Sequence, residues 1–66
     1  MQSKVPDRID LNAKVTAPVT EEIADAIKDA ARLQRISPED FIRSAISDRL
    51  DRLGAPHFRL PILRRF

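Results

Sequence analysis

The stretch "RISPEDF", residues 35–41, separates two helical patterns and decides the fold. Ser37 is a favoured N-cap residue, and Pro38 occupies the first helical position, where its missing N–H costs nothing. Asp40 stands three residues after the cap, as in a capping box, although Glu or Gln is usual there. This arrangement predicts that one helix has ended and that another begins at Pro38.

Apolar residues recur at spacings of three and four on both sides of this stretch. Upstream, the pattern predicts a helix over 21–34, with the hydroxyl of Thr20 as its N-cap. Downstream, it predicts a helix over 38–53, and Gly54 supplies the C-terminal stop. Two amphipathic helices joined by a short turn therefore form most of the chain.

The stretch before the first helix, "IDLNAKVTAPVT" at residues 9–20, alternates between apolar and polar residues. Such alternation predicts a β-strand with one apolar face. A lone strand is marginal in water, so it needs a partner, and no second strand follows in the sequence. We therefore expect a mostly α fold with one short β-strand, completed by an intertwined homodimer with a two-stranded antiparallel ribbon.

The chain divides into three parts on this interpretation. Residues 1–12 form an N-terminal arm, although the strand begins near residue 9. Residues 13–53 form the strand and helices, and residues 54–66 form a C-terminal tail. The tail carries three basic residues and no acid, whereas residues 20–53 carry six bases and eight acids. An anion-binding surface is therefore expected on the strand or the tail.

The composition excludes several classes of function. The 66 residues contain no Cys and a single His, so thiolate chemistry, disulfides and Cys-based metal sites are excluded. The apolar runs are too short for a membrane span or a signal peptide. We expect a cytoplasmic protein that is not an enzyme, with no catalytic residues, no cofactor, no metal and no membrane contact.

The segment "ISPEDFIRSAISDRL", residues 36–50, and the order of elements around it resemble the ribbon-helix-helix DNA-binding family. This resemblance implies an obligate dimer whose ribbon enters the major groove of palindromic DNA. The protein is then a sequence-specific transcriptional repressor, and in a narrower form the antitoxin of a toxin–antitoxin pair that regulates its own operon. The alternative is a protein–protein interaction module, or a plasmid-maintenance accessory protein, whose tail binds a partner protein.

The same resemblance implies which residues contact DNA. Base contacts fall on the outward strand face, at Asn12, Lys14 and Thr16. Phosphate contacts fall at the start of the second helix, on Ser37 and the backbone amides of Glu39 and Asp40. Alternatives from the residues alone are a solvated strand face, a solubilising charge at Lys14 and a Ser37 that only caps its helix.

The turn before the second helix departs from the family pattern. Arg35 stands where the family usually has Gly. A left-handed backbone at that position costs a non-Gly residue about 1–2 kcal/mol. Either the turn differs from the family, or this strain is tolerated.

The tail, "APHFRLPILRRF" at residues 55–66, mixes large apolar residues with arginines. One hypothesis is a peptide that binds a toxin or another protein through its apolar side chains, Phe58, Leu60, Ile62, Leu63 and Phe66. A second is a basic arm on DNA phosphates. A third is that the tail folds back and covers its own dimer. His57 is expected to be a surface or packing residue.

Overall fold

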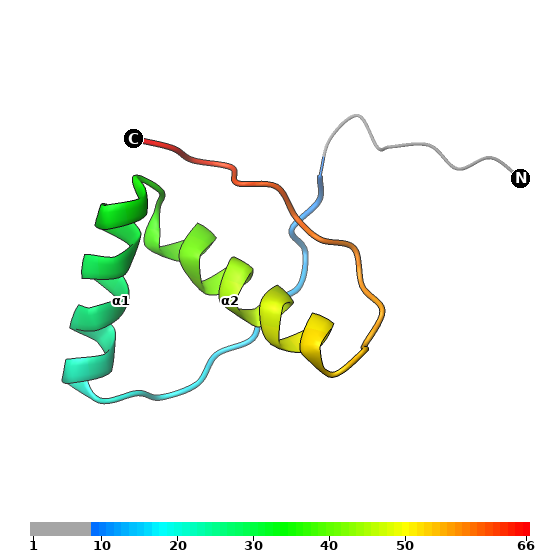
Figure 1. Ribbon diagram of the computed structural model, residues 1–66, viewed down its shortest axis with the longest axis horizontal. Helices are drawn as coiled ribbons and strands as arrows, with labels where there is room; N and C mark the ends of the chain where they lie inside the picture. The colour runs from blue at the N-terminus through cyan, green and yellow to red at the C-terminus, as the bar shows by residue number, and fades with distance from the viewer. Residues whose placement is uncertain (1–8) are drawn as a thin grey trace, which may run out of the picture.

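A computed structural model describes residues 9–66 of the chain, and residues 1–8, most of the expected N-terminal arm, lie outside the described part. Two helices follow one another, α1 over Glu21–Gln34 and α2 over Pro38–Arg52. They meet at a short turn and diverge from it, and the tail runs back from the end of α2 to this turn (Figure 1).

The helix boundaries agree with the capping residues, except that α2 ends at Arg52, one residue before its predicted end. The Oγ1 atom of Thr20 accepts a hydrogen bond from the amide of Ile23 at the start of α1, at 3.2 Å. At the start of α2, Oγ of Ser37 accepts from the amide of Asp40, at 3.1 Å. Beyond α2, Gly54 adopts a left-handed backbone with φ of 74°. The predicted N-caps of both helices and the glycine stop after α2 are therefore confirmed. The reciprocal bond of a capping box is not formed, because the Ser37 amide donates to the Arg64 carbonyl and not to Asp40.

The turn between the helices is left-handed at Arg35, with φ of 59° and ψ of 43°. The amide of Arg35 donates to the carbonyls of Ala31 and Arg32, which closes the end of α1. Of the two alternatives for this turn, the structure has the strained backbone on a residue other than glycine.

The predicted strand and ribbon are wrong. Within residues 9–66 the structure contains no strand and no sheet, and residues 10–20 have no regular secondary structure and are exposed along their whole length. The side chain of Val15 is 81% exposed. The alternating pattern alone does not make a strand, because the ladder hydrogen bonds need a second strand and the chain offers none. The expected ribbon-helix-helix architecture is therefore replaced by a helical hairpin.

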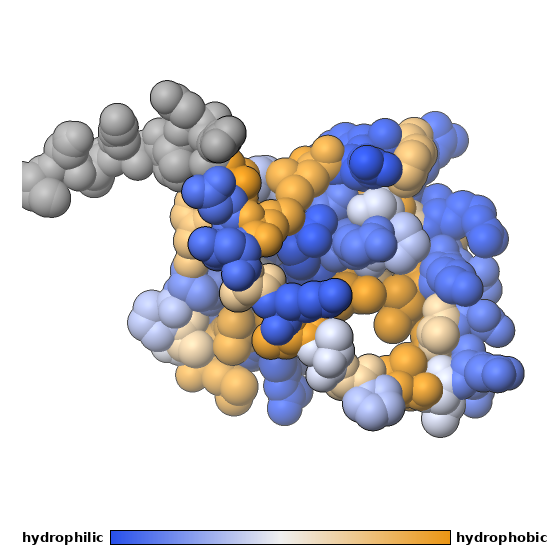
Figure 2. Space-filling model, turned by 180° about the vertical axis from the view of Figure 1, so that it is seen from behind, coloured by the Kyte–Doolittle hydropathy of each residue, from blue (hydrophilic) through white to orange (hydrophobic). Residues whose placement is uncertain are grey.

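The core of the described part is very small. Its buried apolar residues are Ala31 of α1 and Ile36 of the turn. Many large apolar side chains are exposed, and several lie on the surface among hydrophilic residues (Figure 2). These are Leu11, Val15, Val19, Ile23, Leu33, Ile42, Ile46, Leu53, Phe58, Leu63 and Phe66. Neither helix of this part is long and apolar enough to cross a membrane.

Candidate functional site

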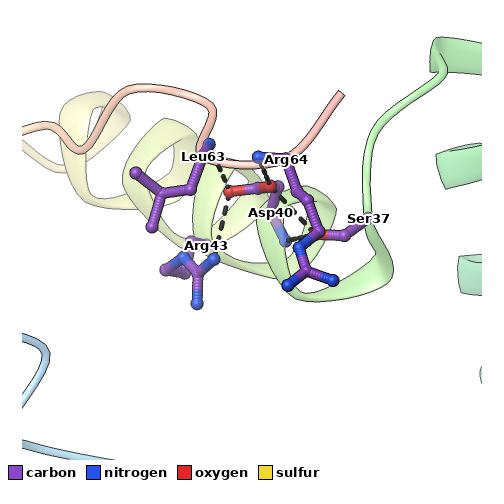
Figure 3. A network of polar contacts seen from close by, with 5 residues as sticks. All are labelled: Ser37, Asp40, Arg43, Leu63 and Arg64. Atoms are coloured by element: carbon purple, nitrogen blue, oxygen red, sulfur yellow. Dashed lines mark hydrogen bonds and ion pairs between the residues drawn. The ribbon is translucent and has the colours of Figure 1, made fainter. Parts of the chain in front are cut away.

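The carboxylate of Asp40 joins the first turn of α2 to the tail (Figure 3). Its Oδ1 accepts from the amide of Leu63 at 3.0 Å and from Nη2 of Arg43 at 3.0 Å. Its Oδ2 accepts from the amide of Arg64 at 2.8 Å and from Oγ of Ser37 at 2.9 Å. A carboxylate has about four acceptor positions, so the buried Asp40, which is 1% exposed, is fully satisfied.

These contacts also fix the charge of Asp40. The hydrogen bond from the Leu63 amide holds the pKa of Asp40 well below its usual range, although burial acts in the opposite direction. The bonds from Ser37, Arg43 and the Arg64 amide lower the pKa further. Asp40 is therefore ionised at neutral pH, when its bonds to the tail are charge-assisted.

Backbone hydrogen bonds extend this junction along the turn. The amide of Ser37 donates to the carbonyl of Arg64 at 3.1 Å, and the amide of Phe66 donates to the carbonyl of Arg35 at 2.8 Å. Ile36 and Arg65 form an isolated antiparallel bridge between these two bonds. The end of the tail is therefore held in a defined register against the turn.

The junction gathers positive charge at one end of the molecule. We call the following residues the cationic end: Lys28, Arg32, Arg35, Arg64 and Arg65. Arg32 forms an exposed ion pair with Asp29, at 3.3 Å, and within residues 9–66 the other four have no carboxylate within ion-pair distance. Three of the five also line a pocket of about 540 Å³ with an apolar floor, whose lining is Lys28, Ala31, Arg32, Arg35, Ile36, Pro38 and Phe66.

The opposite end of α2 holds the start of the tail. Arg59 reaches back to two carboxylates of α2, donating through Nη2 to Asp48 and through Nη1 to Asp51, the latter at 2.8 Å. The bond to Asp48 is the main cause that raises the pKa of Arg59. His57 lies beside these ion pairs of Arg59, with Nδ1 3.0 Å from the carbonyl oxygen of Ala55.

The predicted base-contact residues lie on the segment before α1, which has no regular secondary structure. Asn12, Lys14 and Thr16 are all exposed. Lys14 also lines a groove of about 420 Å³ between this segment and α2, with Ile42 and Ile46 among its other lining residues. No partner strand orders these three side chains in the described chain, and their role as base contacts stays a prediction.

The predicted phosphate-contact residues are largely engaged within the chain. Ser37 and Asp40 are buried, and the Asp40 amide donates to the Ser37 hydroxyl. The Ser37 amide faces the Arg64 carbonyl, while Glu39 is exposed. A phosphate at this helix end would meet the ionised Asp40, and the phosphate role of these groups stays a prediction.

The apolar residues predicted to bind a partner lie along the docked tail. Phe58, Leu63 and Phe66 are exposed, whereas Leu60 and Ile62 are half-buried. In this structure the tail lies on its own α2 through backbone amides, so these side chains do not hold it alone. Their role in binding a partner stays a prediction.

Sequence reasoning missed the contacts between Asp40 and the tail. The two residues of each contact are 23 and 24 positions apart, so no local pattern connects them. The signals that were available are an Asp at the capping-box position and an arginine pair after Pro61. Neither of these signals predicts that Asp40 and the end of the tail are in contact.

No group of three or more metal-ligating side chains occurs within residues 9–66. In comparisons with known proteins, no family model, no curated protein and no solved structure matches the chain. The resemblance to ribbon-helix-helix proteins therefore rests on the sequence segments quoted above.

Proposed function

We propose that the protein is a DNA-binding regulator of transcription that contacts phosphates through its cationic end. The observation that carries this proposal is the contact of the tail end with the turn, which brings the segments that carry these five cations together. Three of the five line one pocket, and four have no carboxylate partner in the described chain. A cluster of this kind is the electrostatic signature of a nucleic-acid surface, because each phosphate that it neutralises releases counterions.

The chemistry of the cluster suits phosphate. Four of its five members are arginines, whose planar guanidinium binds a phosphate through two parallel N–H bonds. The charge on α1 is also polarised, since Glu21, Glu22 and Asp25 lie at its start and the cations lie at its end. A polyanion is therefore drawn to one end of the molecule and repelled from the other.

The proposal includes a homodimer. Because only Ala31 and Ile36 are buried among the apolar residues described, one chain leaves many large apolar side chains in water. Leu33, for example, is 85% exposed on α1. Burial of apolar area contributes about 25 cal/mol per Å², so association with a second copy offers stability that the single chain lacks.

A gel-shift titration of duplex DNA at about 50 and 200 mM salt tests the proposal. Binding should weaken steeply with salt. The double variant R64A/R65A should reduce the slope of log K against log salt by roughly 2, since each lost phosphate contact contributes about 0.9. The control R49A/R52A removes the same charge from the last turn of α2 and should reduce the slope less. Equal slopes for the two double variants would contradict the proposal.

A second function, a protein-interaction module, is favoured by the exposed apolar side chains of the tail and of the 540 Å³ pocket. Phe66 belongs to both features. The antitoxin form of the regulator would use the same surface for its toxin. In the pure interaction module, replacing Phe58 and Phe66 by Ala would abolish partner binding, and no DNA shift would appear at either salt concentration.

A further inference from the structure

We infer that Asp40 is a positioning residue whose carboxylate fixes the end of the tail against α2, so that Arg64 and Arg65 complete the phosphate-binding surface. The inference rests on the proposed function and adds to it how the two tail arginines reach the cationic end. Asp40 itself touches no phosphate.

The geometry around Asp40 supports this role. Each of its carboxylate oxygens accepts one tail amide, from Leu63 and from Arg64, so two consecutive residues are held at once. Ser37 and Arg43 occupy the other acceptor positions and keep the carboxylate oriented toward the tail (Figure 3). Because backbone amides make these contacts, the side chains of Arg64 and Arg65 stay exposed and available to a ligand.

Besides Asp40 and the backbone bonds to the turn, the tail is attached through Arg59, and this attachment is weaker than that of Asp40. Arg59 is held by Asp48 and Asp51, whose side chains are about 60% exposed, and exposed ion pairs contribute little to stability. The hydrogen bonds of Asp40 are buried or part-buried, where loss of one partner leaves a charge unsatisfied. Asp40 therefore accepts two of the four hydrogen bonds between residues 63–66 and the rest of the chain, and these two are the charge-assisted ones.

Ordering the tail matters for binding. Arginines on a loose arm lose side-chain and backbone entropy when they meet a phosphate, whereas docked arginines have lost part of it already. The ionised carboxylate of Asp40 lies in the first turn of α2, and the docked tail engages the Ser37 amide through the Arg64 carbonyl. Phosphate is therefore directed away from this helix end and toward the tail and the end of α1.

The test compares two variants at Leu63 that differ in one amide. Leu63→Pro removes the N–H that donates to Asp40, and Leu63→Ala shortens the same side chain but keeps the N–H. Position 63 lies outside both helices, so circular dichroism should show the same helix content in the two variants. Asp40→Asn is a second variant, which keeps the shape of the side chain and removes its charge.

Two readouts are needed, amide exchange at Arg64 and Phe66 by NMR, and gel shifts on an unselected duplex at two salt concentrations. We expect fast exchange at both amides in L63P and D40N and protection in L63A. We also expect the salt slope of L63P to be lower than that of L63A by roughly 2. Between 50 and 200 mM salt, the DNA-binding constant of L63A should therefore fall about tenfold more than that of L63P.

The inference is overturned if L63P and L63A show the same salt slope, or if the Arg64 amide is equally protected in L63P, D40N and the unmodified chain. Failure of the proposed function looks different. In that case no variant and no unmodified chain would shift DNA at either salt concentration, while the exchange pattern would still follow the Leu63 amide.

Discussion

The left-handed backbone of Arg35 predicts that replacing this residue by glycine raises the free energy of unfolding. The effect comes from backbone conformation and not from side-chain contacts. Arg35 has φ of 59° and ψ of 43°, and its amide closes the end of α1. This conformation costs an L-residue roughly 1–2 kcal/mol, and glycine is free of that cost. Glycine loses about 0.5–1 kcal/mol more conformational entropy on folding. The balance predicts that R35G stabilises the protein by about 0.5–1 kcal/mol.

Urea unfolding at one fixed protein concentration measures this change, because association would make the midpoint depend on concentration. The control is Q34G, one residue earlier, where the backbone still belongs to α1. There glycine should destabilise the protein by about 1 kcal/mol. An R35G protein that unfolds at the same or lower urea concentration than the unmodified chain would refute the reasoning, whatever Q34G does.

Three further predictions concern caps, charge and base contacts. S37A removes the cap of α2 and a donor to Asp40, and should cost about 1 kcal/mol or more in urea unfolding, with no loss as a contradicting result. The pKa of Asp40 is lowered on folding, so the ionised Asp40 should stabilise the protein fully above its ordinary pKa of 3.8. This stabilisation should be lost as the pH falls below 3.8, and the free energy of unfolding of D40N should therefore depend less steeply on pH in acid. K14A/T16A should remove preference for one DNA sequence over another in competition gel shifts, and unchanged preference would exclude these two residues as base contacts.

The helices were predictable because their signals are local. Thr20, Ser37 and Gly54 mark ends that the structure confirms, and each acts on amides or carbonyls within a few residues. α2 ends at Arg52, one residue before the predicted end, with Leu53 as its C-cap. Capping chemistry therefore fixed the boundaries of both helices to within one residue.

The strand could not be decided from residues 9–20, because alternation describes a surface and a strand also requires a hydrogen-bonding partner. The ion pairs show the same limit. Local spacing predicts Glu39 with Arg43 and Asp48 with Arg52. In the structure Arg43 pairs with Asp40 instead, and Asp48 pairs with Arg59 of the tail.

The residues of the candidate site could be predicted from the sequence, but the contact between the tail and the turn could not. The basic tail and the special turn at residues 35–37 both stand out in the sequence, and each was assigned a role separately. Their contact depends on a carboxylate that meets amides 23 and 24 residues away, through backbone groups that every residue carries. Sequence patterns identify side chains, whereas almost every residue carries a backbone amide. A contact made by backbone amides is therefore not marked by any particular residue type in the sequence.

The central claim is that DNA phosphates meet the cationic end, and an NMR titration of the labelled protein with duplex DNA tests it most directly. We expect the amides of Lys28, Arg35, Arg64 and Arg65 to shift together at low salt and to return toward their free positions at high salt. The claim would be contradicted if only the amides of residues 48–52 of α2 shifted. It would also be contradicted if no amide shifted at a large excess of DNA.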